Sequence, residues 1–148
     1  MADFSLALVR LAGHTLRPEH LGGESDMIGY ATLGSNDFEA AKTFYDAVLG
    51  ELGGKRTMTM DRMQGYGSVG GGAMLAICKP YDGQPATVGN GVMISLAAPS
   101  RDLVDKTYAT AVANGAKDEG APGLRGGEFY GAYFRDLDGN KLCVFKVG

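Results

Sequence analysis

The side chains of this chain that could do acid–base, nucleophilic or metal chemistry are few and unevenly placed. Both histidines, His14 and His20, lie in the first 26 residues, so no imidazole occurs from residue 27 onward. The two cysteines, Cys78 and Cys143, stand within apolar, strand-like runs. A buried, reduced thiol is the commoner role for such a cysteine, and we favour it over a disulfide. Cys143 also lacks the imidazole partner that usually activates a nucleophilic thiol.

A second set of side chains could recognise a ligand. Aromatic or flexible apolar residues that could surround a cleft are Tyr66, Met74, Phe129, Tyr130 and Tyr133. They favour either stacking on a small planar molecule or packing in the core. Arg125 stands in a glycine-rich loop, 120–127, where it could bind a carboxylate with both arms of its guanidinium or could be solvated. Glu119 and Glu128 are the nearest acid–base candidates, and each could equally be a surface residue of a strand.

An internal repeat indicates which elements position these residues. The segment KTFYDAV, 42–48, is similar to KTYATAV, 106–112. Each copy lies in a stretch with helical spacing of apolar residues, about 38–52 and 102–114. Asp37 is the expected N-cap of the first helix, and Pro99-Ser100 precedes the second.

Strand-like runs flank both predicted helices in the same order. One run precedes each helix, at 28–33 and 92–97, and three follow it, at 56–60, 64–68 and 73–78 in the first half and 117–120, 129–135 and 141–147 in the second. A linker around 80–85 and a tight turn at 136–140 punctuate the chain. We therefore predict an α+β fold of two tandem βαβββ modules, about 27–80 and 90–147, in one domain over 27–148 behind an N-terminal extension, 1–26.

Four segments resemble the vicinal oxygen chelate superfamily, which is the glyoxalase/bleomycin resistance protein/dioxygenase family. They are NDFEAAKTFY (36–45), NGVMISLAAPS (90–100), EGAPGLR (119–125) and YFRDLDGNK (133–141), in the family's order. Leu137 stands where the last motif usually has proline. The resemblance covers nearly all of the chain after the extension, and it implies that the two sheets form a curved, half-open barrel with the helices outside.

Enzymes of this family bind a divalent metal through one residue from the first and one from the fourth strand of each module, typically His, Glu or Gln. The resemblance carries these positions to Tyr30, Cys78, Met93 and Cys143, none of which is such a ligand. The set is either an apolar lining with one phenol or a soft-metal site suited to Cu(I), and we favour the lining. We therefore expect no metal cofactor.

Three functions are compatible with the resemblance. The leading one is metal-independent binding of a small apolar or aromatic molecule in the barrel cleft; the pocket would comprise Tyr30, Tyr66, Met74, Cys78, Met93, Arg125, Phe129, Tyr133 and Cys143. The alternatives are an enzyme, either a glyoxalase-like lyase or isomerase or a dioxygenase-like one, with an atypical metal site, and a non-catalytic protein-interaction module. We identify no catalytic residue. Resistance-type members bind ligands that are often cationic, which this acidic chain would permit.

Composition limits the partners. The formal net charge is −3, and Lys and Arg form no cluster in the sequence, so nucleic-acid binding is not expected. No apolar run approaches the roughly 20 residues that span a bilayer, and no secretory signal is evident, so we expect a cytoplasmic protein. The resemblance implies a homodimer, and we expect the N-terminal extension to contact the domain or a second subunit.

Overall fold

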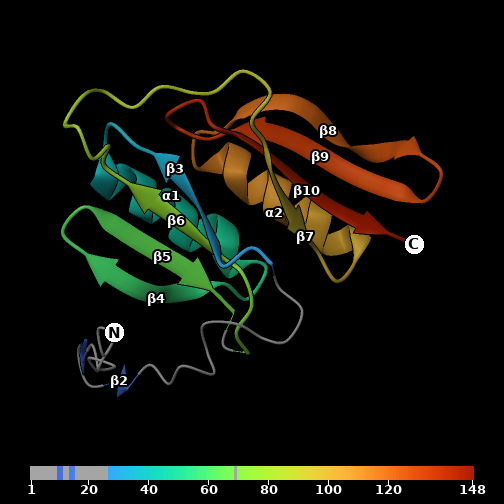
Figure 1. Cartoon of the computed structure of the whole chain (residues 1–148). Coiled ribbons are helices and arrows are strands. Elements are labelled where there is room, and N and C mark those ends of the chain that lie inside the picture. The colour runs from blue at the N-terminus through green and yellow to red at the C-terminus, as the bar shows by residue number, and fades with distance from the viewer. Residues whose placement is uncertain (1–9, 12–13, 16–26, 69) are drawn as a thin grey trace.

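The computed structural model describes residues 10–11, 14–15, 27–68 and 70–148, and it confirms two consecutive βαβββ modules (Figure 1). The first module comprises β3 (Tyr30–Gly34), α1 (Phe38–Gly50), β4 (Lys55–Met60), β5 (Met63–Gly67) and β6 (Met74–Cys78). The second comprises β7 (Ile94–Ala97), α2 (Arg101–Ala113), β8 (Lys117–Gly126), β9 (Phe129–Arg135) and β10 (Lys141–Val147). Upstream, β1 (Arg10–Leu11) and β2 (His14–Thr15) pair antiparallel. The expected contact of the N-terminal extension falls largely on residues outside the described ones.

Each module forms its own four-stranded sheet, and the strand order is the same in both. The first sheet has the order β3-β6-β5-β4 and the second has the order β7-β10-β9-β8. In each, the first strand of the module runs parallel to the last, while the other pairs are antiparallel. Among the described residues, no strand pairing joins the two sheets, so the barrel is open, as predicted.

Capping residues set the starts of both helices where the sequence predicts them. The Asp37 carboxylate accepts a hydrogen bond from the backbone N–H of Ala40 at 3.0 Å, and the Ser100 hydroxyl accepts one from Leu103 at 3.2 Å. These bonds satisfy backbone donors that have no partner within the first turn of a helix. The chain leaves α1 through Gly53, whose φ of 77° favours glycine.

The hydrophobic core lies between the helices and one face of each sheet. Figure 1 shows α1 against the first sheet and α2 against the second, and the two helices also contact each other. Phe44 and Val48 of α1 and Val104 of α2 are fully buried in this core. At the junction of the helices, Glu51 pairs with Lys106 at 2.8 Å. One side of each sheet is therefore packed in the core, and the other side faces away from the helices.

A buried carboxylate joins the two modules. Asp136 lies in the turn between β9 and β10 and is only 6% exposed. It accepts hydrogen bonds from the Tyr45 hydroxyl of α1 at 2.7 Å, from the backbone N–H groups of Asp138 and Asn140, and from the Asn140 amide at 2.9 Å. The same amide donates to the Gly34 carbonyl of β3 at 3.0 Å. The turn of the second module is thus tied to a helix and a strand of the first.

Two of the differences between predicted and observed strand boundaries concern the second sheet. The sequence predicts that a strand ends at residue 120 and a glycine-rich loop follows, whereas β8 continues to Gly126 with several register shifts against β9. Within the extended strand, Gly120 allows a close approach, because a Cβ there would lie 3.2 Å from both the Arg125 guanidinium and the Tyr133 ring. The strand β7 begins at Ile94, so Met93 precedes it. Among the described residues, no helix is long and apolar enough to cross a bilayer.

Removing the hydroxyl of Tyr45 tests the junction. We expect Tyr45→Phe to lower the free energy of unfolding by about 1.5–3 kcal/mol, because the buried Asp136 carboxylate loses a donor. Urea denaturation measures the change. The exposed Tyr81 provides a matched control, because Tyr81→Phe should stay within about 0.5 kcal/mol of the native chain. A Tyr45→Phe variant as stable as the native chain would show that this bond does not hold the modules together.

The same hydroxyl predicts a loss of stability at alkaline pH. Burial, followed by the nearby Asp136, raises the pKa of Tyr45 well above its usual value of about 10. The folded state therefore keeps a proton that the unfolded chain releases, so this contribution is complete below about pH 10 and is lost as the pH rises further. Urea denaturation between pH 8 and 11 should show a shallower decline for Tyr45→Phe than for the native chain. Equal slopes would contradict the assignment.

Candidate ligand-binding site

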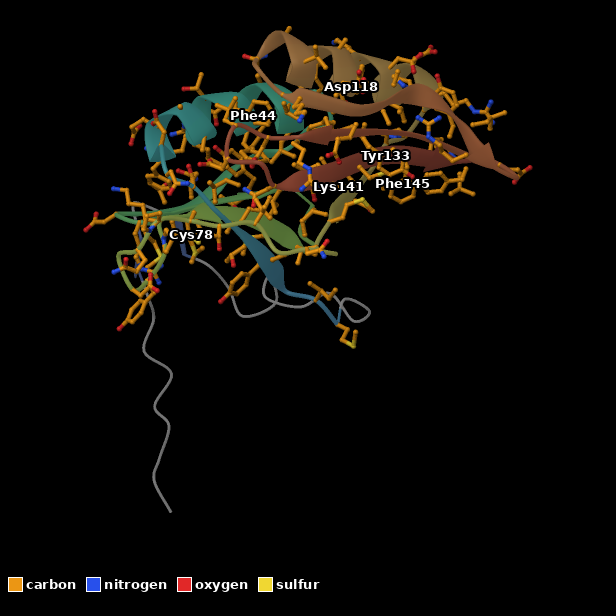
Figure 2. All side chains as sticks on the ribbon, turned by 90° about the horizontal axis from the view of Figure 1, so that it is seen from above. Phe44, Cys78, Asp118, Tyr133, Lys141 and Phe145 are labelled. Atoms are coloured by element: carbon orange, nitrogen blue, oxygen red, sulfur yellow. The ribbon has the colours of Figure 1, made fainter. Side chains whose placement is uncertain are left out.

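The face of the second sheet that points away from α2 gathers most of the chemically distinctive side chains. Successive strand residues point to opposite faces, and Phe134, Leu142 and Val144 point into the core. The opposite face, hereafter the ligand face, comprises Ser95, Glu119, Arg125, Phe129, Tyr133, Arg135, Lys141, Cys143 and Phe145. Figure 2 shows Lys141 and Phe145 on the side of β9 and β10 away from α2.

Strand register arranges this face in rows. Cys143 lies between Ser95 of β7 and Tyr133 of β9, and Gly120 of β8 follows Tyr133 in the same row. The row toward the carboxyl end of β10 contains Phe145 and Gly131. The ligand face therefore has a centre formed by the Cys143 row, flanked by an aromatic end and a charged end.

Two stacked rings form the aromatic end. Phe129 and Phe145 lie parallel, with ring centroids 5.1 Å apart and planes 8° apart. Gly131 makes room for them, because a Cβ at this position would lie 2.7 Å from the Phe129 ring. Both rings are only partly buried. A partly exposed aromatic pair at the edge of a ligand face can extend its stack onto a planar molecule.

Cationic side chains surround Tyr133 at the charged end. The Arg125 guanidinium carbon and the Lys141 Nζ each lie 5.6 Å from the centre of the Tyr133 ring, which is within cation–π range. Glu119 pairs with Arg135 at 2.7 Å and with Lys141 at 3.3 Å. Arg135 is the main cause of the lowered pKa of Glu119, with Lys141 adding to it. Glu119 is therefore held as a carboxylate and is a poor general acid.

Cys143 occupies the floor of the ligand face as a neutral thiol. The residue is fully buried. Burial raises the pKa of its thiol, and this effect outweighs the contacts with Tyr133 and Ser95 and the nearby charges of Arg125 and Lys141, which lower it. At neutral pH the thiol keeps its proton, so it neither adds charge to the face nor acts as an activated nucleophile.

A cavity adjoins the charged end. It has a volume of about 520 Å³ and is lined by residues 88–93, the last part of the linker that leads from β6 to β7, together with Arg135 and Lys141. Met93, which is 41% exposed, contributes its flexible thioether side chain to the lining. The volume falls in the range typical of small-molecule pockets, about 300–1,000 Å³. A smaller cavity of about 180 Å³ lies between the modules and is lined mainly by apolar residues.

The structure brings together five of the nine residues that the sequence assigns to one pocket. Arg125, Phe129, Tyr133 and Cys143 share the ligand face, and Met93 lines the adjoining cavity. The other four, Tyr30, Tyr66, Met74 and Cys78, belong to the first sheet. In Figure 2, Cys78 lies apart from Tyr133, Lys141 and Phe145.

The four residues of the first sheet do not form one group. Tyr66 is buried on the core side, where its hydroxyl donates to the Lys42 carbonyl of α1 at 3.1 Å; it thus packs under the sheet. Tyr30 is 57% exposed and lies opposite Met74, whereas Cys78 lies four positions further along the same strand pair. Four positions along a strand correspond to about 13 Å.

Comparison with known proteins assigns the family. The family model of the Glyoxalase/Bleomycin resistance protein/Dioxygenase superfamily matches residues 27–144, and the chain belongs to this superfamily. The crystal structure of a glyoxalase/bleomycin resistance protein from Albidiferax ferrireducens T118 is similar over 81% of this chain and 98% of that one, with 40% identity and a TM-score of 0.75. A search of curated proteins found no match.

Two further solved structures share the fold. The hypothetical protein SA1046 from S. aureus is 27% identical over 84% of this chain and 94% of that one, with a TM-score of 0.64. A lactoylglutathione lyase from Agrobacterium tumefaciens is 20% identical over 83% and 94% of the two chains, with a TM-score of 0.61. At this identity, the second comparison concerns the fold alone.

The metal that the family implies can be tested against the donors present. In the second module, Ile94 follows Met93 and pairs with Leu142, and Cys143 is the next residue along β10. In the first module, Ala31 follows Tyr30 and pairs with Leu75, and Ala76 is the next residue along β6. Strand register thus relates Cys143 to Ala76 and not to Cys78. A phenol, a methyl group, a thioether and a neutral thiol do not fit a divalent metal. Nowhere in the described part of the chain do three His, Cys, Asp or Glu residues gather at a spacing that could hold an ion.

Sequence reasoning missed Ser95, Arg135, Lys141 and Phe145 as members of the face. A signal was present, because strict alternation along 141–147 places Lys141 and Phe145 on the same side as Cys143. The same alternation along 129–135 groups Arg135 with Tyr133 and Phe129. The sequence did not show which of the two sides faces the helix.

Thiol reactivity should distinguish the two cysteines. Cys143 is fully buried with a raised pKa, whereas Cys78 is partly exposed. We expect iodoacetamide at pH 7.5 to label Cys78 first and Cys143 only slowly, with both labelled quickly in 6 M guanidinium. Peptide mass spectrometry measures each site, and Cys78→Ser isolates the slow reaction. Rapid labelling of native Cys143 would show that the floor of the ligand face is open or ionised.

Proposed function

We propose that this protein binds a small, largely apolar or aromatic molecule on the ligand face of its second sheet, without a metal ion. The observation that carries the proposal is the partly exposed Phe129–Phe145 stack on the same face as Tyr133, with a cavity of about 520 Å³ at the opposite, charged end of that face. Ligand sites are commonly concave and aromatic-lined, with a few polar groups that fix orientation. Here the polar groups are those around Tyr133.

The chemistry of the face supports binding over catalysis. Its carboxylate, Glu119, is held in ion pairs with Arg135 and Lys141, and its thiol, Cys143, keeps its proton. An acid–base pair needs one group with a pKa near the working pH, and neither of these meets that condition. The four metal-ligand positions of the family also carry no imidazole or carboxylate. The homodimer and the cytoplasmic location stay predictions.

Titration with a neutral aromatic probe tests the proposal. We expect 2-naphthamide to bind the native protein and to raise the free energy of unfolding by about 2.7 kcal/mol at 100 times its Kd. Phe145→Leu, which keeps an apolar side chain but removes one ring of the stack, should weaken binding about 3–10-fold. Calorimetry measures the Kd, and elemental analysis of protein purified without chelator measures bound metal.

The exposed Tyr81 provides the control, because Tyr81→Leu removes an aromatic ring away from the ligand face and should leave the Kd unchanged. A stoichiometric divalent metal would contradict metal-independent binding. Failure of a folded protein to bind any naphthalene probe, neutral or charged, or equal binding by Phe145→Leu, would contradict the assignment of this face.

A further inference from the structure

We infer that the natural ligand of the ligand face is an anion, and the geometry points to a planar aromatic carboxylate. The inference rests on the proposed function, because it concerns the charge of the molecule that occupies the same face. It sharpens that proposal, which by itself would be satisfied by a neutral ring.

The first support is a local excess of positive charge on a protein that is negative overall. The chain has a formal net charge of −3. On the ligand face, however, three cations accompany one carboxylate, namely Arg125, Arg135 and Lys141 with Glu119. Glu119 can neutralise only one of them. A charged ligand is attracted where the local field is opposite in sign, whatever the net charge of the protein.

Arg125 is the cation with the most binding capacity left. Its guanidinium donates to the Ala121 carbonyl and lies beside the Tyr133 ring, but it forms no ion pair with any residue that the structure describes. A guanidinium is a planar fork of donors that matches the two oxygens of a carboxylate. The contact with Tyr133 places this fork next to the ligand face, although Arg125 itself is exposed.

Lys141 supplies a second donor on the same side. Its ammonium lies 3.3 Å from Glu119, which Arg135 approaches more closely at 2.7 Å. Arg135 is therefore the main partner of Glu119, and Lys141 keeps donors for a ligand. Lys141 also lines the cavity of about 520 Å³, so a carboxylate that reaches it from the ligand face enters a space large enough for a small molecule.

The aromatic and charged ends are separated by a distance that one molecule can span. Phe145 lies two positions along β10 from Cys143, the direct neighbour of Tyr133, and four positions from Lys141. These spacings correspond to about 7 Å and about 13 Å. The head groups of Arg125 and Lys141 reach back toward the centre of the face, because each lies 5.6 Å from the centre of the Tyr133 ring. A ring that extends the Phe129–Phe145 stack can thus direct a carboxyl substituent toward Arg125 and Lys141. The neutral Cys143 thiol between the two ends opposes neither part.

Three naphthalene probes of similar size separate charge from ring recognition. Calorimetry at low ionic strength should give at least about 10-fold tighter binding for 2-naphthoate than for neutral 2-naphthamide, with the cationic 2-naphthylmethylammonium weakest. Raising the salt from 20 to 500 mM should weaken 2-naphthoate and leave 2-naphthamide unchanged.

Neutral substitutions locate the charge effect. Arg125→Gln should weaken 2-naphthoate about 10-fold, and Lys141→Gln should weaken it about 3-fold, while 2-naphthamide changes less than about 2-fold for both. Arg62→Gln is the matched control, because Arg62 also lies against a tyrosine ring, that of Tyr81 at 5.1 Å, but outside the ligand face. It should bind all three probes as the native chain does. Near-UV circular dichroism verifies that each variant is folded.

The outcomes separate the two proposals. Equal binding of 2-naphthoate and 2-naphthamide, or tightest binding of the ammonium probe, overturns the anion inference and leaves the proposed function standing. The anion inference is also overturned if 2-naphthoate binds tightly but Arg125→Gln and Arg62→Gln weaken its binding equally. In that case the positive charge would act from outside the ligand face. Binding of none of the three probes to a folded protein overturns both.

Discussion

The buried carboxylate of Asp136 is the interaction on which the arrangement of this protein depends. A carboxylate in a protein interior is costly unless its oxygens are satisfied, and Asp136 accepts four hydrogen bonds from the turn and from Tyr45. The residues on either side of this turn are Arg135 and Lys141, which form the charged end of the ligand face. The bonds that join the modules therefore also fix the end of β9 and the start of β10, the two strands that carry most of the site.

The same junction positions the linker that closes one side of the cavity. Asn36, next to β3, donates to the Ala86 carbonyl at 3.1 Å and accepts from its N–H at 2.7 Å, while its own N–H donates to Asp138 of the turn. Gly34 admits the linker at this point, because a Cβ there would lie 2.9 Å from the Ala86 side chain. Residues 88–93 are thus led across the turn to the position where they line the cavity. The hydrogen bonds between Asn36 and Ala86 therefore help to set the shape of the cavity, although Asn36 is far in sequence from β9 and β10.

Much of the fold was predictable from the sequence because its signals are local. The apolar periodicity, Asp37 and Ser100 gave both helices within two residues at each end, and the strands 129–135 and 141–147 match β9 and β10. The site was less predictable because it depends on contacts between distant segments. Tyr66 has the composition of a pocket residue but bonds to α1. The register that equates Cys143 with Ala76 follows from strand pairing, and no periodicity in either strand specifies it.

The neutral thiol of Cys143 determines how much of the positive charge near it is left for a ligand. A carboxylate in place of Cys143 would lie in the row of Tyr133, within the field of Arg125 and Lys141. Its negative charge would neutralise one of these cations. A buried, protonated thiol does not. Attraction between charges strengthens as water is excluded, so a neutral residue at position 143 leaves the cations of this face able to act on a ligand that brings its own negative charge.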